Sequence, residues 1–278
     1  MISRVETIYY SPTGTSGKIA EAVAEAFVKQ CAETAWAVPS SGVTDLTLGV
    51  NPKSFDNTFA VIAAPVYGGR VAPTAIGRLR EISAGSNSLC AVIAVYGNRD
   101  YEDALLELVN EARSCGFVPV AAGAFIGEHS YSTEEYPIAQ DRPDSQDLDK
   151  CMEFGRELSG FYSGKLPENL ELPDIKGNFP YKEYNPSPAT PQTDVSRCVL
   201  CGRCIDMCPV GCIEMMSAVA MGEESEVIVS NPAVCTKCCA CVKGCPFGAR
   251  VYNTPYSEML HKNFGARKEP EWFIAGRQ

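Results

Sequence analysis

Short apolar runs alternate with amphipathic segments over the first 163 residues. Val5–Tyr10 is rich in β-branched and aromatic residues, and three continuous apolar runs follow at Thr58–Ala64, Leu89–Val95 and Phe117–Ile126. Apolar runs of this length, bounded by polar residues, predict strands buried on both faces of a sheet.

Helical spacing of apolar residues fills the segments between these strands. We predict helices over Ser16–Cys31, Ala72–Ile82, Tyr101–Cys115 and Ser145–Tyr162. Strands that alternate with helices through short connections form a parallel sheet covered on both faces. The predicted fold class of residues 1–163 is therefore α/β, with a doubly wound parallel sheet.

The pattern changes after residue 163. Residues 164–193 contain six prolines and little periodicity, which predicts an extended linker on the surface. Residues 194–255 hold most of the cysteines. Residues 256–278 form a C-terminal tail, and its aromatic side chains, Trp272 and Phe273, lead us to expect that it packs back on the rest of the chain.

Two copies of a four-cysteine motif occupy residues 194–255. The first reads C-x2-C-x2-C-x3-C-P, and the second repeats it 37 residues further on. Three thiolates at this spacing hold one side of a [4Fe-4S] cubane, and the fourth cysteine ligates the other cluster. We therefore predict one cluster on Cys198, Cys201, Cys204 and Cys245, and a second on Cys235, Cys238, Cys241 and Cys208.

Zinc and disulfide bonds are the competing interpretations. Zinc ribbons use cysteine pairs separated by a longer stretch, which differs from four cysteines within eleven residues. Disulfides are typical of exported proteins, but Met1–Glu6 has no apolar signal-peptide core, so we expect reduced thiols. The acidic insert between Cys208 and Cys235 predicts a hairpin that ends in Val227–Val229.

Six of the fourteen cysteines lie outside the motifs. Cys212 stands where the second repeat has Ala249, so we interpret it as a small packing residue. Cys239 lies within a ligand loop and could replace a ligand only by breaking the motif spacing. The other four are predicted core residues: Cys31, Cys90, Cys115 and Cys151. Over residues 194–255 the motifs resemble the bacterial two-cluster ferredoxins, which implies a small α+β domain.

A polar loop, Ser11–Lys18, follows the first predicted strand and opens the first helix. Backbone N–H groups, hydroxyls and the helix dipole of such a loop can bind a phosphate. A nucleotide P-loop does not match, because Gly14 and Gly17 are three residues apart and Ile19 follows Lys18. A polar turn before a well-capped helix is the simpler alternative.

Two further loops, Pro65–Arg70 and Tyr96–Tyr101, follow predicted strands. Ligands of open α/β sheets bind outside the carboxyl ends of the strands, where all three loops should lie. Their glycines admit a flat ring and their tyrosines can stack on it, although Tyr67 and Tyr96 could instead cap the sheet edge. An open pocket lined by His129, Tyr67 and Arg70 would favour a small substrate.

The last predicted strand leads into a loop that holds His129, one of two histidines. We expect it near the proposed ring as a hydrogen-bond or proton donor, the alternative being a structural role. The long segment 130–144, which includes Arg142-Pro143-Asp144, is expected to form a lid or a docking surface.

These loops resemble the flavodoxin family over residues 1–163. Ser11–Ser16 matches its phosphate loop, with serine at the first and last hydroxyl positions, and Tyr101 matches a frequent ring-stacking position. The resemblance implies FMN, held by Ser11, Thr13, Gly14, Thr15, Ser16, Pro65, Val66, Tyr67, Gly68, Gly69, Tyr96, Gly97, Asn98, Arg99, Tyr101 and His129.

The whole chain resembles fused flavodoxin–ferredoxin proteins of anaerobic bacteria and archaea. Besides the order of its parts, three stretches look like that family: Gly127–Ser130, Arg142–Asp144 and Arg267–Glu271. The reactions of the family are largely unassigned, so the resemblance implies an architecture, a flavodoxin-like sheet followed by a two-[4Fe-4S] ferredoxin domain, and no substrate.

Composition and charge restrict the partners. The net charge of −10 argues against nucleic acid and anionic membranes. No apolar stretch approaches the ~18 residues of a membrane span, so we expect a cytoplasmic protein.

The cofactor set predicts the function. FMN exchanges electrons singly or in pairs, and a cluster exchanges them singly. We predict an electron-transfer flavoprotein of anaerobic metabolism that serves a redox protein partner. The alternative is an FMN-dependent reductase of a small organic substrate, with His129 as a catalytic proton donor, and a redox sensor comes third. The linker could place the clusters over the flavin of the same chain or of a second subunit in a homodimer.

Overall fold

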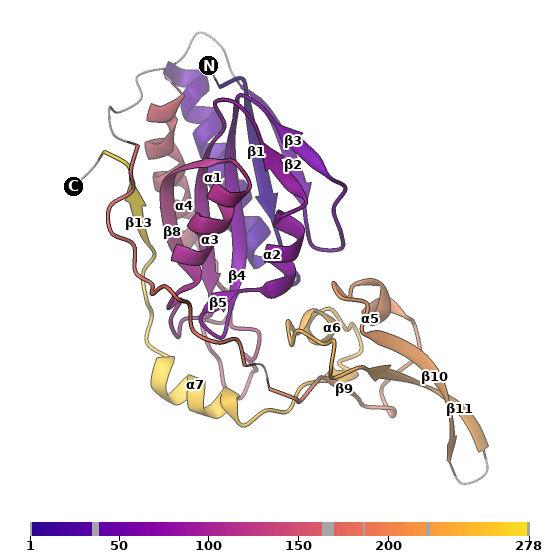
Figure 1. Cartoon of the computed structure of the whole chain (residues 1–278). Coiled ribbons are helices and arrows are strands. Elements are labelled where there is room, and N and C mark those ends of the chain that lie inside the picture. The colour runs from indigo at the N-terminus through magenta and orange to yellow at the C-terminus, as the bar shows by residue number, and fades with distance from the viewer. Residues whose placement is uncertain (1, 35–38, 163–169, 186, 221–222, 277–278) are drawn as a thin grey trace.

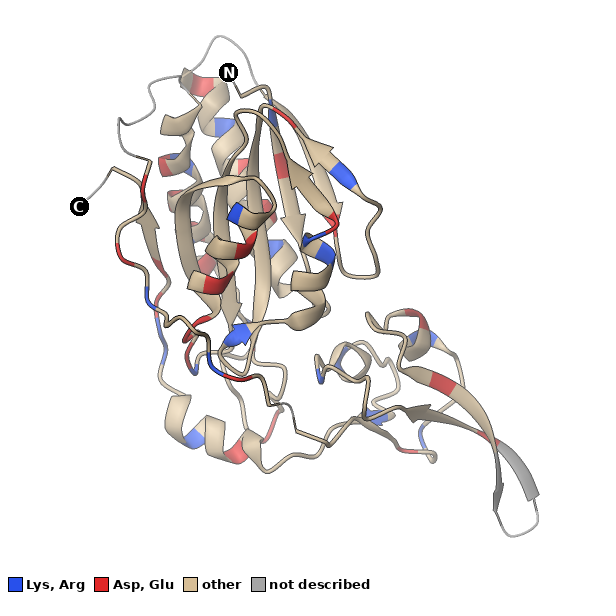
Figure 2. Ribbon diagram, viewed as in Figure 1, with Lys and Arg blue, Asp and Glu red and all other residues tan. Residues whose placement is uncertain are grey.

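The computed structural model describes residues 2–34, 39–162, 170–185, 187–220 and 223–276. Within them, an α/β body stands above a small cysteine-rich module, and a C-terminal return segment runs from the module back to the body (Figure 1). Acidic and basic residues are interspersed along the ribbon of both parts (Figure 2), so the net negative charge is not confined to one element.

A mostly parallel sheet forms the centre of the α/β body. Its parallel strands are β1 (Arg4–Tyr9), β2 (Ser40–Asp45), β4 (Thr58–Tyr67), β7 (Leu89–Tyr96) and β8 (Val118–Ile126). They lie in the order β8-β7-β4-β1-β2. This is the 2-1-3-4-5 order of flavodoxin-like folds, with the order reversing at β1 and β4. The predicted fold class is therefore confirmed.

Helices cover both faces of this sheet (Figure 1). On one face, α1 (Thr15–Thr34) and α4 (Ser145–Leu158), which is extended by a 3-10 turn, η1 (Ser159–Phe161), bury one apolar cluster. On the other face, α2 (Pro73–Leu79) and α3 (Ala104–Ser114) bury a second. The four cysteines predicted to be core residues are buried in these two layers.

Short strands complete the body and shift some predicted boundaries. β3 (Lys53–Phe55) pairs with β6 (Ile82–Ala84), so Ile82 belongs to a strand and not to the predicted helix. β5 (Arg70–Val71) folds back on β4, which extends through Tyr67. Pro65 therefore lies within the strand, close to its carboxyl end.

The cysteine-rich module is built from short elements around the two motifs. The predicted hairpin is present as β10 (Ile213–Ala220) and β11 (Glu223–Ser230). Short helices follow the ligand loops, α5 (Arg203–Asp206) in the first repeat and α6 (Ala240–Lys243) in the second. β9 (Gln192–Thr193) and β12 (Arg250–Val251) pair at its base.

The return segment connects the module to the α/β body. It contains α7 (Tyr256–Phe264) and β13 (Glu271–Ile274), and β13 pairs antiparallel with β8 at the sheet edge. Trp272 stacks on Phe125 with ring centroids 6.1 Å apart. The tail thus packs back on the sheet, as its aromatic residues predicted.

Candidate functional site

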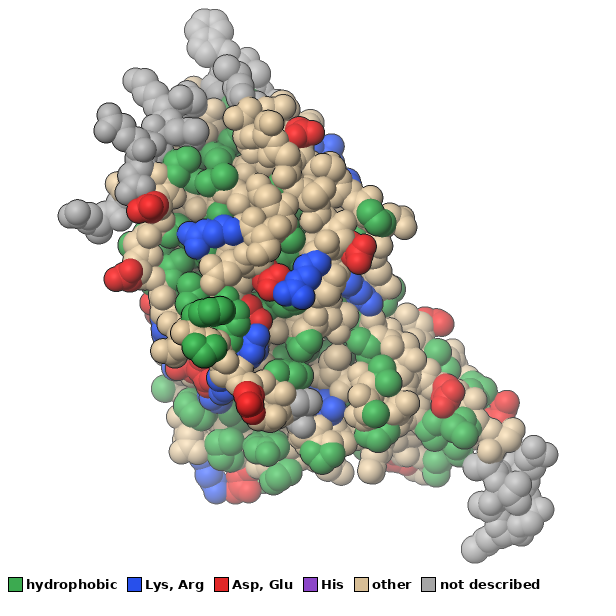
Figure 3. All heavy atoms as spheres, viewed as in Figure 1, with side chains coloured by type: hydrophobic (Ala, Val, Ile, Leu, Met, Phe, Trp, Pro, Cys, Tyr) green, Lys and Arg blue, Asp and Glu red, His purple; other side chains and the backbone are tan. Residues whose placement is uncertain are grey.

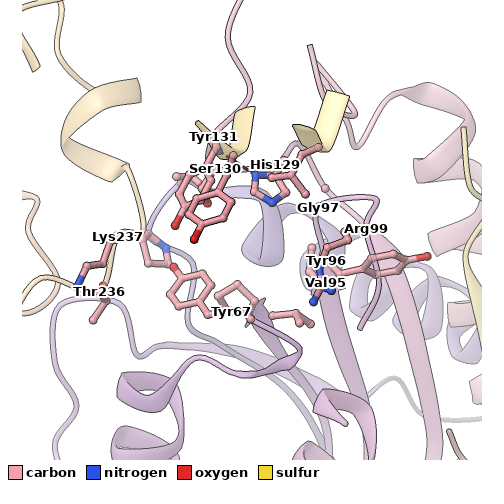
Figure 4. Close-up of a pocket in the computed structure, with 18 of the residues that line it drawn as sticks. Tyr67, Val95, Tyr96, Gly97, Arg99, His129, Ser130, Tyr131, Thr236 and Lys237 are labelled. Atoms are coloured by element: carbon pink, nitrogen blue, oxygen red, sulfur yellow. Dashed lines mark hydrogen bonds between the residues drawn. The ribbon is translucent and has the colours of Figure 1, made fainter. Parts of the chain in front are cut away.

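A cavity of about 520 Å³ lies at the carboxyl edge of the parallel sheet. Residues at and just beyond the carboxyl ends of β1, β4, β7 and β8 line it from the body, and residues of the linker, α7 and the cysteine-rich module line it from the other side. Figure 4 shows Thr236 and Lys237 on one side of this space and Tyr96, Gly97 and Arg99 on the other. The cavity is within the size range of small-molecule and cofactor sites.

The loop after β1 presents hydroxyl groups at the start of α1. Ser11, Thr13, Thr15 and Ser16 line the cavity, whereas Gly14 does not, and its positive φ of 83° makes the turn. Ser11 Oγ accepts a hydrogen bond from Gly17 N (2.9 Å), which holds the loop in shape. Ser16 Oγ is buried and has no hydrogen-bond partner. An acceptor-rich anion such as a phosphate fits this loop because it would satisfy that hydroxyl and the first N–H groups of the helix.

The two other predicted loops contribute most of their expected residues. Pro65, Val66, Tyr67, Gly68, Tyr96, Gly97 and Arg99 line the cavity. Gly69 does not, because it faces Glu102: a Cβ there would lie 2.3 Å from Glu102 Oε2. Flexible glycine backbone beside tyrosine rings suits a flat aromatic ligand.

Two residues of the Tyr96–Tyr101 loop lie away from the cavity. Asn98 is buried, and its side-chain nitrogen donates to Phe264 O (2.5 Å) and Ala266 O (2.8 Å) at the end of α7. Tyr101 is buried too, with its hydroxyl donating to Glu271 Oε1 (2.9 Å) and Lys176 over its ring. The predicted contacts of Asn98 and Tyr101 with a flavin ring do not fit these positions, because both side chains bind the tail and linker instead.

His129 lies where it was predicted, at the cavity after β8. Its Nδ1 accepts from Tyr131 N (3.0 Å), so a neutral ring carries its proton on Nε2. Burial, together with the charges of Lys243 and Arg99, lowers its pKa to about 4. His129 is therefore neutral at neutral pH and offers an N–H donor rather than a charge.

Gly97 leaves the space that the His129 ring occupies. A Cβ on Gly97 would lie 2.4 Å from His129 Cδ2 and 2.8 Å from its Cα. Because the second contact is with backbone, a rotamer change of His129 would not relieve it. The glycine thus permits the two loops to pack together.

The linker covers one side of the cavity, which it lines with Lys182, Glu183, Tyr184 and Asn185. Asp103 fixes this segment by accepting from Asn178 N and Lys182 N, both at 2.8 Å. Burial raises the pKa of Asp103, but these hydrogen bonds outweigh it and hold the pKa below its usual value. Arg70 does not line the cavity: it pairs with Glu107 and donates to Lys182 O (2.5 Å).

Helix α7 covers another side through Tyr256, Met259 and Leu260. Ser257 Oγ donates to Tyr131 O (2.9 Å), and Lys268 Nζ, just beyond the helix, donates to Arg99 O (2.6 Å). Tyr256 and Met259 remain partly exposed, and Figure 3 shows hydrophobic side chains at the surface near the lower end of the molecule, where α7 lies. The helix is thus held to the cavity loops at both ends.

The segment 130–144 supports this cover. Arg142 forms a buried ion pair with Asp147 and donates to Lys268 O (2.9 Å). Arg267 pairs with Asp144 (2.6 Å), whose pKa its guanidinium lowers. The Arg-Pro-Asp stretch, expected in a lid or docking surface, therefore holds the return segment against the body.

A ligand loop of the cysteine-rich module reaches the same cavity. Thr236 and Lys237, which stand between Cys235 and Cys238, line it. Sequence reasoning missed them, although the repeat carries a signal: the equivalent residues of the first motif, Val199 and Leu200, are apolar. The loop that binds the proposed second cluster therefore shares a cavity with the phosphate-type loop of the same chain.

Contacts on both sides of this loop join the module to the body. Lys243 pairs with Glu128 (2.6 Å), and Arg78 donates to Pro209 O, next to Cys208. Arg78 also donates to Leu46 O (2.6 Å) within the body. The module is thus fixed beside the cavity.

The cysteines of the two motifs fit a pair of clusters. All are free thiols, and ligands of both motifs gather in one apolar cluster with Ile213 and Ile228. The two halves repeat the same N–H···S contact, Cys212 N to Cys208 Sγ and Ala249 N to Cys245 Sγ, both at 3.3 Å. Amide donors aimed at ligand sulfurs are a feature by which proteins tune iron–sulfur clusters.

The halves differ in exposure. Cys201 of the first motif is exposed, whereas its equivalent in the second motif, Cys238, is buried. Cys212 is buried with its Sγ 3.5 Å from Cys208 Sγ, and Cys239 is buried with its Sγ directed at Lys237 O. The assignment of individual ligands to clusters stays a prediction.

Comparison with known proteins identifies the module. Residues 197–249 match the 4Fe-4S dicluster domain family, which implies two 4Fe-4S clusters. No curated protein matches the chain.

No helix of the described residues is long and apolar enough to cross a membrane.

Solved structures align with the α/β body. A flavodoxin from the domain Archaea is 11% identical, with a TM-score of 0.34 and coverage of 56% of this chain and 96% of that one. Fusobacterium nucleatum flavodoxin bound to flavin mononucleotide is 12% identical, with a TM-score of 0.37 and coverage of 56% of this chain and 97% of that one. Rubredoxin oxygen:oxidoreductase from Desulfovibrio gigas is 12% identical, with a TM-score of 0.39. The alignment covers 58% of this chain and only 36% of that one.

The strand order and the family match together define the class of protein. The chain is a flavodoxin-like α/β protein that carries a 4Fe-4S dicluster domain at residues 197–249. The architecture implied by the resemblance to fused flavodoxin–ferredoxin proteins is confirmed.

Proposed function

We propose that this protein transfers electrons between two [4Fe-4S] clusters and an FMN bound in the cavity, as part of anaerobic metabolism. One observation carries the proposal: Thr236 and Lys237 of a cluster-ligand loop line the same cavity as Ser11–Ser16 and His129. A redox group in the cavity and a cluster on that loop would be neighbours within one chain.

Different cavity residues would hold the phosphate and the ring system of FMN. In the proposal, the Ser11–Ser16 loop binds the phosphate, with Ser16 Oγ as a free donor, and the Tyr67 and Tyr96 loops flank the ring system. His129 offers Nε2–H to an acceptor on the ring. FMN, when bound, supplies one- and two-electron chemistry to a protein whose clusters exchange single electrons.

The unequal exposure of the two motifs suggests a direction through the module. Cys238 and Cys241 are buried, and Thr236 and Lys237 of the same ligand loop line the cavity, whereas Cys201 is exposed and Val199 near it is 57% exposed. We place the second cluster next to the cavity and the first at the surface, where an external redox protein would dock. This arrangement needs no second subunit, so the homodimer predicted as an alternative is not required for it.

Cofactor content tests the proposal first. Protein purified without oxygen should contain about eight irons and one FMN per chain. Fewer than about four irons would exclude two clusters. A one-electron donor too large to enter the cavity should then reduce FMN in the intact protein and not in Cys201→Ala, Cys204→Ala, which lacks two ligands of the first cluster. Equal FMN reduction in both proteins would contradict the proposed path.

The cover over the cavity favours a second candidate, a reductase of a small organic molecule. A cavity enclosed by the linker and α7 is a poor docking surface for a protein at the flavin, and a neutral His129 would donate a hydrogen bond from Nε2–H to a bound substrate. Oxidation of the reduced protein by a panel of small organic acceptors, compared with oxidation by an electron-transfer protein, distinguishes the two. A saturable rate with one organic acceptor that His129→Gln lowers would favour the reductase.

A further inference from the structure

Arg250 is a buried cation that has no acidic partner among the described residues. It lies in β12 with 2% of its surface exposed. The oxygens to which its guanidinium donates are neutral, Thr193 Oγ1 (2.5 Å), Pro191 O (3.0 Å) and Ser230 Oγ, and its Nε is buried without a partner. Burying a charge is costly unless an opposite charge accompanies it. Within the described residues, no such group is in contact with it.

The guanidinium lies beside a cysteine of the second motif. Arg250 Nη2 is 3.9 Å from Cys241 Sγ. Cys241 is the third cysteine of that motif and is assigned to the second cluster. The charge of Arg250 is thus next to a predicted ligand of the second cluster.

The internal repeat shows that the fold does not require a cation here. The residue equivalent to Arg250 in the first motif is Ile213, 37 positions earlier, which is 5% exposed. An aliphatic side chain therefore fills this position in one half of the module. The other half carries a full charge where the fold accepts a hydrophobic residue.

We propose that Arg250 is the counter-charge of the cluster on Cys241 and raises the reduction potential of that cluster. Each cluster with its four thiolates is an anion, and reduction makes it one unit more negative. A nearby guanidinium in a dry interior stabilises the reduced form more than the oxidised form. Arg250 acts through the cluster and is a positioning residue rather than a catalytic one. The inference rests on the proposed two-cluster occupancy.

Redox titration followed by electron paramagnetic resonance tests this in the full-length protein. Arg250→Gln should lower the reduction equilibrium constant of the second cluster at least tenfold, which is about 59 mV for one electron, and that of the first cluster less. Arg250→Lys should keep most of the wild-type potential. Arg197→Gln, which removes an exposed arginine of the same module that pairs with Asp194, should leave both potentials unchanged.

A second pair of variants tests the charge without removing Arg250. Ser230→Asp places a carboxylate next to Nη2 and should lower the same potential, whereas Ser230→Asn should not. If Arg250→Gln loses iron, the two Ser230 variants still test whether the charge at this position affects the reduction potential of the cluster. Unchanged potentials in Arg250→Gln or Ser230→Asp at full iron content would overturn the inference, as would equal shifts in Arg250→Lys and Arg250→Gln. Wild-type protein that lacks iron would instead refute the proposed function.

Discussion

Lys243 of the dicluster module forms an ion pair with Glu128 of the α/β body, Nζ to Oε1 2.6 Å. Glu128 adjoins His129 in the loop after β8, and Lys243 ends α6, the short helix that contains Cys241 of the second motif. The pair therefore joins the two loops that approach each other at the cavity. Its role is to set their relative position.

Breaking this pair should slow electron transfer between the module and the cavity more than it destabilises the protein. Both side chains are about one quarter exposed, so the stability cost of Lys243→Gln should stay below about 1 kcal/mol. Stopped-flow measurement should show slower flavin reduction in Lys243→Gln than in the wild type. Added salt should slow flavin reduction in the wild type until its rate approaches that of the variant. The swap Lys243→Glu, Glu128→Lys should restore the rate. Lys262→Gln, which breaks an exposed pair within α7, is the control. A wild-type rate in Lys243→Gln at low salt would contradict the prediction.

Ser16→Ala should act in opposite directions on stability and on flavin binding. Without a ligand, Ser16 Oγ is buried and unsatisfied, so its removal should leave the flavin-free protein unchanged or more stable by about 1 kcal/mol. With a phosphate in the loop, the same hydroxyl donates a charge-assisted hydrogen bond, and its loss should weaken FMN binding about tenfold. Urea unfolding and FMN titration measure the two effects. Unchanged FMN affinity would remove Ser16 from the phosphate site.

Gly97→Ala should disturb the cavity because a Cβ at this position overlaps His129, including its backbone. We expect a destabilisation of about 1–3 kcal/mol and a loss of FMN affinity of at least about tenfold. Gly77→Ala is the matched control, since Gly77 lies in α2 with open space around its Cβ position, and alanine there should stabilise the helix by about 0.5–1 kcal/mol. Equal behaviour of the two variants in FMN titration would refute the steric explanation.

His129 should make the protein less stable as the pH falls through the mildly acidic range. Its pKa is about 4 in the folded protein and 6.5 in the unfolded chain, so below pH 6.5 the unfolded chain binds the proton more readily. Above pH 6.5, protonation of His129 should not change the unfolding free energy of the wild type. From pH 6.5 toward pH 4, that free energy should fall by about 1.4 kcal/mol per pH unit. The difference in unfolding free energy between wild type and His129→Gln should therefore shift by about 1.4 kcal/mol between pH 7.5 and pH 5.5. A constant difference would show that His129 is not held neutral.

The long buried elements could be predicted from the sequence because their periodicity is strong. The four inner strands and the helices that cover them follow the predicted segments closely. β2 was missed because it is an edge strand with few apolar residues and an exposed Val43. β13 was missed because its pairing with β8 joins residues about 150 positions apart, which local pattern does not reveal.

For the candidate site too, residues fixed by local sequence could be predicted, whereas residues held by distant segments could not. Ser11–Ser16 was predictable because its turn and helix start are local, and the eight motif cysteines because their spacing is specific. Asn98 and Tyr101 were misplaced because the residues that hold them, in the return segment, are far along the chain. Thr236 and Lys237 could have been noticed by comparing the repeats, since polar residues replace the apolar Val199 and Leu200.

Strand β13 belongs to the sheet of the first domain but is made after the dicluster module and α7. During synthesis from the N-terminus, the edge of β8 stays open until the linker, the dicluster module and α7 have left the ribosome. Because α7 and the linker cover the cavity, its entrance can close only after the cysteine motifs have been translated. The order of residues along the chain thus places full enclosure of the cavity after synthesis of the cysteine motifs.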